Sequence, residues 1–262
     1  MLSPPSSAVS ASTVPLVNAQ TNQRASMDIR LKLVLQCFFA EFFGTAMVLF
    51  TGCMGALETR LFDNSHFQYS LNMALMVMVA VQCFGHVSGG HINPAVTLAG
   101  WICGVVKFHM VLAYFVGQFL GSIAGFGLLK LIVSTDNGFC MTLPGNNIST
   151  GQAFAIEFVI TSILITVCCS TWDDKNSKFQ DSLALRLGLT VGTLLFSAGN
   201  LSGGSMSPVR SFGPALWSMD FTQHWIYWVA PMSASLATSL VYKTVFMSTQ
   251  EMASHLSIHV VD

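Results

Sequence analysis

The chain has 262 residues, of which 52% are hydrophobic and only 9% charged, and its formal net charge is −1. Soluble domains carry about 25% charged residues, so a chain with so few could hardly cover a soluble surface, and the composition predicts a polytopic membrane protein. The near-zero net charge gives no indication of nucleic-acid binding.

The N-terminal region is rich in Ser, Pro and Ala and has no long apolar core. We therefore expect a disordered cytosolic tail over residues 1–32. A cleaved signal peptide is not expected because no apolar stretch precedes Arg24. The predicted channel domain follows over residues 33–247, with one repeat at about 33–133 and a second at about 151–247. A polar cytosolic tail is expected over residues 248–262.

Six segments are apolar and long enough to cross a bilayer, which takes about 20 residues. They lie at about 33–57, 67–84, 109–133, 152–171, 182–201 and 223–246. Two further apolar pieces, from Pro94 to about residue 104 and from Pro208 to about residue 218, are too short. At 1.5 Å per residue each measures about 16 Å, roughly half of the hydrocarbon core. We predict two half-helices that enter the membrane from opposite sides.

A near-repeat marks where each half-helix begins. Ser-Gly-Gly-His-Ile-Asn-Pro-Ala-Val, which ends at Val96, returns as Ser-Gly-Gly-Ser-Met-Ser-Pro-Val-Arg, which ends at Arg210. Both copies place a small polar residue before a proline, and this pattern starts helices. Glu41 and Glu157 open the two halves at similar distances upstream. Each half then has three full spans, so the halves insert with opposite orientation, and a functional site is expected near the midplane.

Basic residues predict the orientation of the chain. Eight of them fall on the side of the N-terminus and two on the other side, which places both termini in the cytosol. The eight are Arg24, Arg30, Lys32, Lys107, Lys175, Lys178, Arg186 and Lys243, and the two are Arg60 and Lys130. This topology puts the glycosylation sequon at Asn147 outside.

The seven cysteines lie mostly in apolar stretches, and they show neither metal-ligand spacing nor a disulfide framework. Cys140 alone falls in a polar connector, where we expect a free thiol. On the third span, glycines recur every four residues and predict close helix packing within the chain. These glycines are Gly117, Gly121 and Gly125.

At the two near-repeats the chain resembles the aquaporin (major intrinsic protein) family. Gly-His-Ile-Asn-Pro-Ala-Val and Met-Ser-Pro-Val-Arg-Ser-Phe-Gly-Pro-Ala are similar to its two signature loops. The Ala-Glu-Phe-x-Gly-Thr opening and the run His224–Pro231 match as well. The resemblance covers about residues 33–247. It implies an all-α membrane fold with six spans, two re-entrant half-helices and an inverted 3+3 repeat.

The resemblance also implies a homotetramer of four separate pores that pass water and small uncharged solutes passively through a lipid bilayer. We expect a plasma-membrane location, no cofactor and no nucleic-acid partner. The half-helix tips, expected to meet at the pore centre, comprise Asn93, Pro94, Ala95, Ser207, Pro208 and Val209. The alternative is that these residues only cap the two helices and have no role in transport.

Ser207 and Val209 depart from the family, which normally has Asn-Pro-Ala twice. Serine still caps a helix and its hydroxyl still donates, but it reaches less far than asparagine. Valine is larger than alanine. These departures put strict proton exclusion and the width of the pore centre in question.

A selectivity constriction is expected at four positions that align with the family: Met73, Leu195, Gly204 and Arg210. Arg210 is basic within an apolar signature, and such a charge usually faces a cavity or a partner. Strict water channels resemble one another in having phenylalanine and histidine at the first two positions, and this chain has neither. A slip of one residue in the alignment would place Leu194 or Phe196 where we expect Leu195.

A wider and more apolar constriction beside one arginine suits a solute with a carbon edge and a hydroxyl edge, such as glycerol or urea. Glycerol facilitators often have aspartate directly after the arginine, whereas Ser211 is similar to the water-channel branch. The combination is similar to insect entomoglyceroporins, which resemble water channels that have lost the constriction histidine.

Four further polar residues are candidates for holding the re-entrant loops in place. Glu41 and Glu157 are lone carboxylates in apolar helices and are expected to accept hydrogen bonds from loop N–H groups. Proton relay in a transporter is the alternative. His91 is expected to hold its own loop, and His86 either does the same or lines the inner vestibule. Gating by a histidine is a further alternative.

The sequence thus predicts a passive channel and not an enzyme, since it contains no catalytic constellation and no nucleotide-binding loop. Two other classes stay open. One is a secondary transporter with inverted repeats, coupled through Glu41 or Glu157. The other is an adhesive or junctional membrane protein whose pore is closed, with Ser207 and Val209 marking the lost function.

Overall fold

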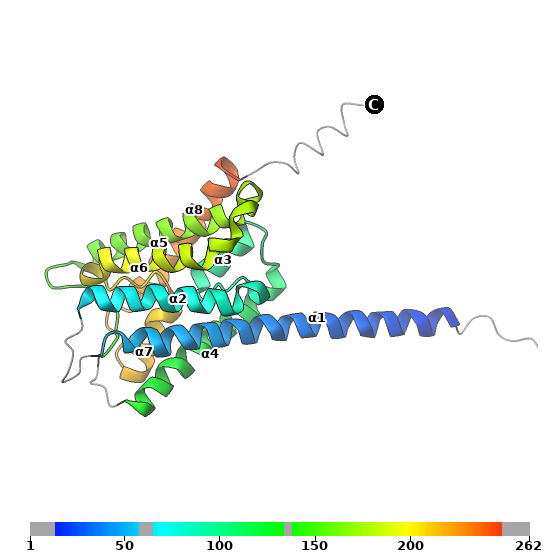
Figure 1. The fold of residues 1–262 in the computed structure, drawn as a ribbon, viewed down its shortest axis with the longest axis horizontal. Coiled ribbons are helices and arrows are strands. Elements are labelled where there is room, and N and C mark those ends of the chain that lie inside the picture. Colours follow the sequence, from blue (N-terminus) through cyan, green and yellow to red (C-terminus); the bar gives the residue numbers. More distant parts are fainter. Residues whose placement is uncertain (1–13, 58–64, 134–137, 248–262) are drawn as a thin grey trace, which may run out of the picture.

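The computed structural model describes residues 14–57, 65–133 and 138–247. Within these ranges the chain is a helical bundle without strands (Figure 1). The helices are α1 (Val14–Met47), α2 (His66–Ser88), α3 (Pro94–Ile102), α4 (Phe108–Ile132), α5 (Thr150–Trp172), α6 (Leu183–Ser202), α7 (Pro208–Ser218) and α8 (Ile226–Val245). A π-helical turn, η1 (Val48–Gly52), continues α1, and a 3₁₀ segment, η2 (Asp174–Ser182), precedes α6. This order confirms the predicted all-α membrane fold.

Capping boxes start α2, the second span of the first half, and α5, the first span of the second half. Ser65 Oγ accepts a hydrogen bond from the Gln68 N–H at 3.2 Å, while Gln68 Oε1 accepts from the Ser65 N–H at 2.8 Å. Ser149 and Gln152 repeat this exchange at 3.3 and 2.8 Å. Such reciprocal pairs satisfy N–H groups that the first helical turn leaves free.

The first helix begins earlier than the sequence analysis predicts. The expected span starts at residue 33, but α1 starts at Val14, so much of the predicted disordered tail is helical. Pro15 lies at the helix start, where proline is tolerated, and neither glycine nor proline interrupts residues 16–43. In Figure 1, α1 projects well beyond the rest of the bundle. The remainder of the predicted tail, residues 1–13, and the C-terminal tail from residue 248 lie outside the described residues.

Five helical segments within the described residues are long and apolar enough to span a membrane. They are Asp28–Gly52, His66–Ser88, Phe108–Ile132, Thr150–Trp172 and Asp174–Ser202. The sixth predicted span forms α8, which is 20 residues long but richer in serine. Its serine hydroxyls donate to helical carbonyl groups, as Ser239 does to Ser235 O at 2.6 Å. These polar groups are therefore satisfied inside the protein, so α8 does not need the apolar composition of the other spans.

The glycine stripe of α4 packs against α1, as predicted. A Cβ atom on Gly121 would lie 2.3 Å from the carbonyl oxygen of Phe42, so only glycine permits this approach. A second close approach joins the two halves between α6 and α2, where a Cβ on Gly188 would lie 2.5 Å from Ala74 O. The two pairs of tightly packed helices form the frame around the re-entrant segments.

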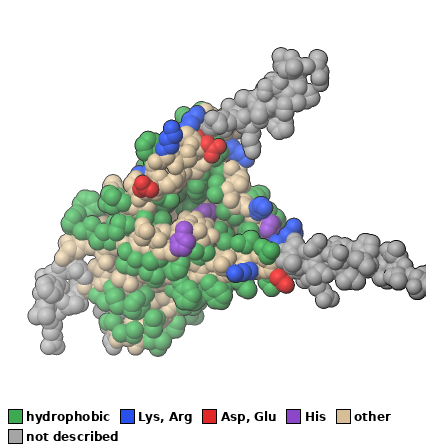
Figure 2. Space-filling view, turned by 45° about the vertical axis from the view of Figure 1, so that its right-hand side comes forward, with side chains coloured by type: hydrophobic (Ala, Val, Ile, Leu, Met, Phe, Trp, Pro, Cys, Tyr) green, Lys and Arg blue, Asp and Glu red, His purple; other side chains and the backbone are tan. Residues whose placement is uncertain are grey.

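The outer surface suits a lipid environment. Figure 2 shows hydrophobic side chains over most of one face of the bundle, with charged side chains near its upper and right-hand margins. Large apolar side chains are exposed along several helices, among them Leu112, Leu131 and Val159. An exposed apolar surface of this extent marks contact with membrane or protein.

Candidate functional site

A cavity of about 100 Å³ lies between the helices, where the two re-entrant segments approach each other. One side of its wall is apolar and comes mainly from valine and leucine side chains of η1, α2, α5 and α6. The other side is polar and includes Asn93, Ser207 and Arg210. The cavity therefore brings residues from both halves of the chain to one surface.

The two re-entrant loops have nearly the same backbone. Left-handed conformations recur at matching positions, with φ of 85° and 97° at the first glycine and 60° at the second in both loops. Ile92 and Met206 then adopt φ of 46° and 54°, which side chains other than glycine rarely do. Such backbone persists only where the surroundings hold it.

Glu41 holds the first loop. Its Oε1 accepts hydrogen bonds from Ser88 Oγ at 2.6 Å and the His91 N–H at 2.9 Å. Its Oε2 accepts from the Ile92 N–H at 2.6 Å and from Gln118 Nε2 at 2.7 Å. Both carboxylate oxygens are thus occupied by donors of the loop and of α4.

Glu157 holds the second loop in the same way. Its Oε1 accepts from Ser202 Oγ at 2.7 Å and from the Ser205 N–H at 2.9 Å, and Oε2 accepts from the Met206 N–H at 2.9 Å. Both glutamates are fully buried. Carboxylates whose oxygens accept this many bonds are suited to fixing a loop, which is the predicted arrangement.

The tips of the half-helices touch, but their polar side chains are used differently. Asn93 Oδ1 accepts from the Ala95 N–H at 2.9 Å, and Asn93 Nδ2 donates to Met206 O at 2.8 Å. Ser207 occupies the matching N-cap position with the same φ of −156°. Its hydroxyl caps nothing, and it is buried without a hydrogen-bond partner among the described residues. Ser207 also lines the cavity, so this unused hydrogen-bonding group lies beside that space.

The helix prolines and their neighbours complete the tips. Pro94 and Pro208 stand at the first position of α3 and α7, as predicted. Val209 is buried, and its carbonyl oxygen accepts a hydrogen bond from Ser122 Oγ of α4 at 2.5 Å. Ala95 is also fully buried.

All four residues expected at the constriction line the same cavity: Met73, Leu195, Gly204 and Arg210. A Cβ atom on Gly204 would lie 2.7 Å from Leu195 Cδ1, so glycine leaves the space that leucine fills. The neighbours of Leu195 point elsewhere, since Leu194 packs in the core toward α5 and Phe196 is 52% exposed. Of the three alternatives, Leu195 is the one that lines the cavity.

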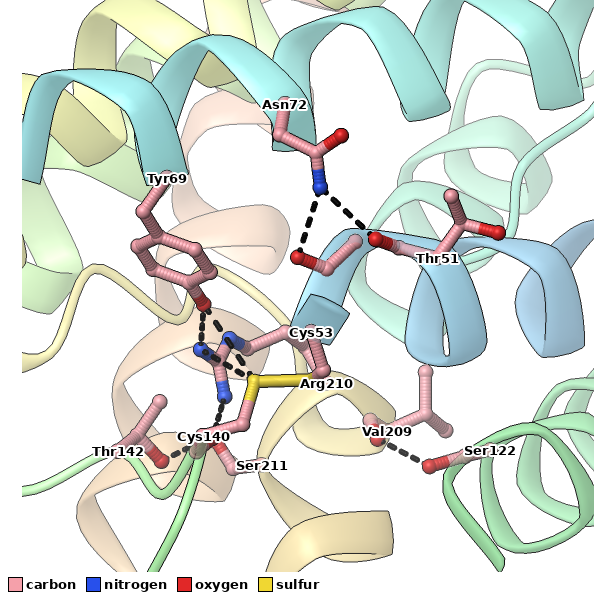
Figure 3. Close-up of a disulfide and its surroundings, with 11 residues drawn as sticks. Thr51, Cys53, Tyr69, Asn72, Ser122, Cys140, Thr142, Val209, Arg210 and Ser211 are labelled. Carbon is pink, nitrogen blue, oxygen red and sulfur yellow. Dashed lines mark hydrogen bonds between the residues drawn. A yellow bond between two sulfur atoms is a disulfide. The ribbon is translucent and has the colours of Figure 1, made fainter. Parts of the chain in front are cut away.

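Arg210 makes contacts that the sequence analysis did not predict. Its Nη1 donates to the carbonyl oxygen of Cys140 at 2.7 Å, and its Nη2 donates to the hydroxyl of Tyr69 (Figure 3). Cys140 was expected to be a free thiol, and that expectation is wrong, because it forms a disulfide with Cys53. The two cysteines are 87 positions apart, so no short spacing indicated the pair. The predicted topology carried the usable signal, since it places both at the outer side.

Residues 28–242 match the family described as Major intrinsic protein. The chain belongs to this family. It is 36% identical to Aquaporin-4 of Mus musculus over 189 residues, which cover 71% of this chain and 58% of that protein. It is 33% identical to Aquaporin TIP2-1 of Arabidopsis thaliana over 229 residues, covering 83% of this chain and 90% of that one.

The fold also matches a solved structure of the family. The X-ray structure of the aquaglyceroporin from Plasmodium falciparum superposes with a TM-score of 0.71 at 24% identity and covers 81% of this chain and 96% of that one. This likeness confirms the aquaporin-like fold. The chain spans only about 58% of the length of the Aquaporin-4 relatives that it matches.

The two histidines expected beside the first loop of this major intrinsic protein lie in different places. His91 lines the cavity, with Nδ1 3.2 Å from Thr97 Oγ1, and its buried Nε2 has no partner among the described residues. His86 is exposed on α2 and is not part of the cavity wall. Within the described residues, no group of three His, Cys, Asp or Glu side chains is arranged to hold a metal ion.

Proposed function

We propose that this major intrinsic protein forms a passive transmembrane channel for water and small uncharged solutes. The observation that carries the proposal is the single cavity to which both half-helix tips and Arg210 contribute. Two helix N-termini directed at one point supply positive potential, which repels cations and orients water. Ser207 Oγ and the Arg210 guanidinium supply hydrogen-bond donors along the polar side.

The solutes that fit this wall include glycerol and urea. Met73 and Leu195 form an apolar side, and Arg210 supplies donors on the polar side of the same cavity. Such a wall matches a solute that has a carbon edge, which packs on the apolar side, and a hydroxyl edge, which accepts hydrogen bonds from the polar side. The absence of histidine at position 195 removes a polar group that would favour water. These features support an entomoglyceroporin-like selectivity.

We further propose that the channel is a homotetramer in the plasma membrane with both termini in the cytosol. The Cys53–Cys140 disulfide supports this orientation, because disulfides persist in oxidising compartments such as the cell exterior. Asn147 of the glycosylation sequon lies in the same connector as Cys140. The proposed function requires no cofactor and no catalysis.

Paired water and glycerol permeabilities in proteoliposomes test the proposal. The purified chain is reconstituted, and vesicle volume is followed by stopped-flow light scattering after an osmotic step with sucrose or glycerol. We expect fast, non-saturating flux of both that does not change with pH. Flux that requires a proton or sodium gradient would point to a coupled transporter instead. Vesicles that shrink no faster than bare lipid, but cluster with each other, would point to an adhesive role.

A matched control for this experiment is the Arg210→Lys variant, which keeps the positive charge but loses the planar set of five donors. If the charge alone repels cations, this variant still excludes them. If the guanidinium fork positions the solute, the variant's glycerol permeability changes while its cation exclusion does not.

A further inference from the structure

Arg210 owes its position at the cavity wall to acceptors from two elements. The hydroxyl of Tyr69 on α2 accepts from Nη2, and the carbonyl oxygen of Cys140, in the connector after α4, accepts from Nη1 at 2.7 Å. Nη2 also lies 3.7 Å from Cys140 Sγ. All three acceptors are neutral atoms. A guanidinium with five donors keeps one orientation only where such acceptors stay in place.

The Cys140 carbonyl lies in a turn that one local backbone hydrogen bond closes, from the Met141 N–H to Gly138 O at 3.2 Å. Cys140 has φ of 57°, in the left-handed region that residues other than glycine rarely adopt, and Gly138 close before it has φ of 91°. A turn of this kind keeps its conformation only where surrounding contacts hold it. The disulfide to Cys53 is a covalent contact of this kind, with the two Cα atoms 5.7 Å apart.

The other end of the disulfide is fixed next to the cavity wall. Cys53 is fully buried and directly follows η1, whose residues Val48 and Leu49 line the cavity. Asn72 Nδ2 of α2 donates to the carbonyl oxygens of Thr51 at 2.8 Å and Gly52 at 3.1 Å (Figure 3). These bonds satisfy carbonyl groups at the end of the π-helical turn. The disulfide therefore ties a loop turn to a well-packed element.

The remainder of the connector has anchors of its own. Thr142 Oγ1 donates to Ser211 Oγ at 2.6 Å, and the Gly145 N–H donates to Leu201 O at 2.8 Å. Loss of the disulfide would therefore release the turn at Cys140 while the connector stays docked on α6 and α7. The effect would be confined to the acceptors of Arg210.

We propose that the Cys53–Cys140 disulfide is a specificity-determining positioning element of the outer constriction, which acts by holding the Cys140 carbonyl against Arg210. This inference rests on the proposed channel function. Without the disulfide, the guanidinium loses its fixed acceptor and no longer occupies one place at the wall. The constriction then widens on average, and a solute larger than water gains more permeability than water does.

The test compares glycerol-to-water permeability ratios in proteoliposomes. The Cys53→Ala/Cys140→Ala pair is expected to raise the ratio at least about threefold, a change of the size expected when a hydrogen bond to a charged group is weakened. The Cys103→Ala/Cys169→Ala pair is the matched control, since these thiols lie 3.6 Å apart near the C-terminal end of α5, within hydrogen-bonding distance, and are not joined by a disulfide. That pair is expected to leave the ratio unchanged.

Repeating the comparison in an Arg210→Ala channel separates positioning of the guanidinium by the disulfide from general stabilisation of the fold. A disulfide also stabilises a fold through the unfolded state, so both alanine pairs can lower the melting temperature. Only the positioning role predicts that removing the disulfide from an Arg210→Ala channel changes the ratio no further. If the alanine pair does not insert, the Cys53→Ser/Cys140→Ser pair, which is close to the thiols in size, provides the same comparison.

Two results would overturn the proposal. One is an unchanged ratio in the disulfide-free channel that still carries Arg210. The other is a further rise in the Arg210→Ala background, because the effect would then not pass through Arg210. Failure of the channel function itself looks different, because the wild-type vesicles would conduct no faster than lipid alone.

Discussion

The two re-entrant segments share one backbone but differ in what their tips offer. In the first segment, both ends of the Asn93 amide are bonded: its oxygen accepts from the Ala95 N–H in the helix cap, and its nitrogen donates to Met206 O of the other loop. In the second, Ser207 keeps a buried hydroxyl without a partner among the described residues. The second segment also carries Arg210 and is bonded to the connector through Thr142. The first segment thus uses its tip amide to hold the two loops together, whereas the second carries the unpartnered hydroxyl and the charged guanidinium.

The glutamates under the two loops provide the strongest test of this comparison. Glu41→Ala leaves four hydrogen-bond donors without their acceptor, and Glu157→Ala leaves three. Each buried donor left unsatisfied lowers the free energy of unfolding by about 1–3 kcal/mol. We expect both variants to melt well below the wild type, with the Glu41 variant lower. Thermal unfolding in detergent measures this. Glu41→Gln and Glu157→Gln, which keep one acceptor oxygen, should lie between, and an equal or reversed order would contradict the assignment.

The next largest effect is expected at Arg210. Arg210→Ala removes the charged donor from the second segment, and we expect the glycerol-to-water ratio to rise about tenfold, equivalent to one hydrogen bond to a charged group. Cation leak should rise as well. Stopped-flow scattering measures the first quantity, and a potential-sensitive dye in the same vesicles measures the second. If the glycerol-to-water ratio of Arg210→Ala equals that of the wild type, Arg210 is not part of the constriction.

The apolar side of the constriction is tested at Leu195. Leu195→His adds a polar group and is expected to lower the glycerol-to-water ratio about tenfold, the scale of a changed pocket wall. Phe196→His is the matched control, because Phe196 is exposed on the outside of α6 and does not line the cavity. If the two histidine variants behave alike, the cavity-facing position has been misassigned.

The unpartnered hydroxyl of Ser207 is expected to give a smaller effect. Ser207→Ala removes the free donor without adding bulk, and we expect glycerol permeability to fall about threefold, the worth of part of one neutral hydrogen bond. Ser205→Ala is a useful comparison, because that hydroxyl is already bonded to Ser207 O and Ser211 Oγ. Loss of flux only in the Ser205 variant would mean that loop geometry, not the Ser207 donor, controls passage.

The smallest shift is expected at Tyr69. Tyr69→Phe removes one acceptor of Arg210 but leaves the Cys140 carbonyl in place, so the glycerol-to-water ratio should rise about twofold at most. Water and glycerol permeabilities are measured by stopped-flow light scattering, as for the other variants. A larger rise than in the disulfide-free channel would make the tyrosine, and not the disulfide, the main support of the guanidinium.

Much of this molecule could be predicted from local patterns. The Asn-Pro and Ser-Pro pairs start half-helices at the predicted residues because a cap and a proline act within one helical turn. The start of the first helix was harder to predict, since residues 14–32 are not apolar, and only the absence of Gly and Pro over residues 16–43 indicates a helix that extends this far. The resemblance of the signature loops predicted Arg210 and Leu195 as constriction residues, and the cavity includes both.

The sequence by itself determined the elements whose causes are local: the apolar lengths, the helix starts, the internal repeat and the membership of a family. Only the tertiary structure decided the contacts between distant segments. In the folded chain, Cys53 is bonded to Cys140, and the Tyr69 hydroxyl lies against Arg210. The Ser207 hydroxyl has no partner among the described residues, and His86 lies on the exposed surface of α2, outside the cavity wall. The physical reason is that hydrogen bonds and disulfides depend on distances of a few ångströms, and packing sets these distances between residues that are tens of positions apart.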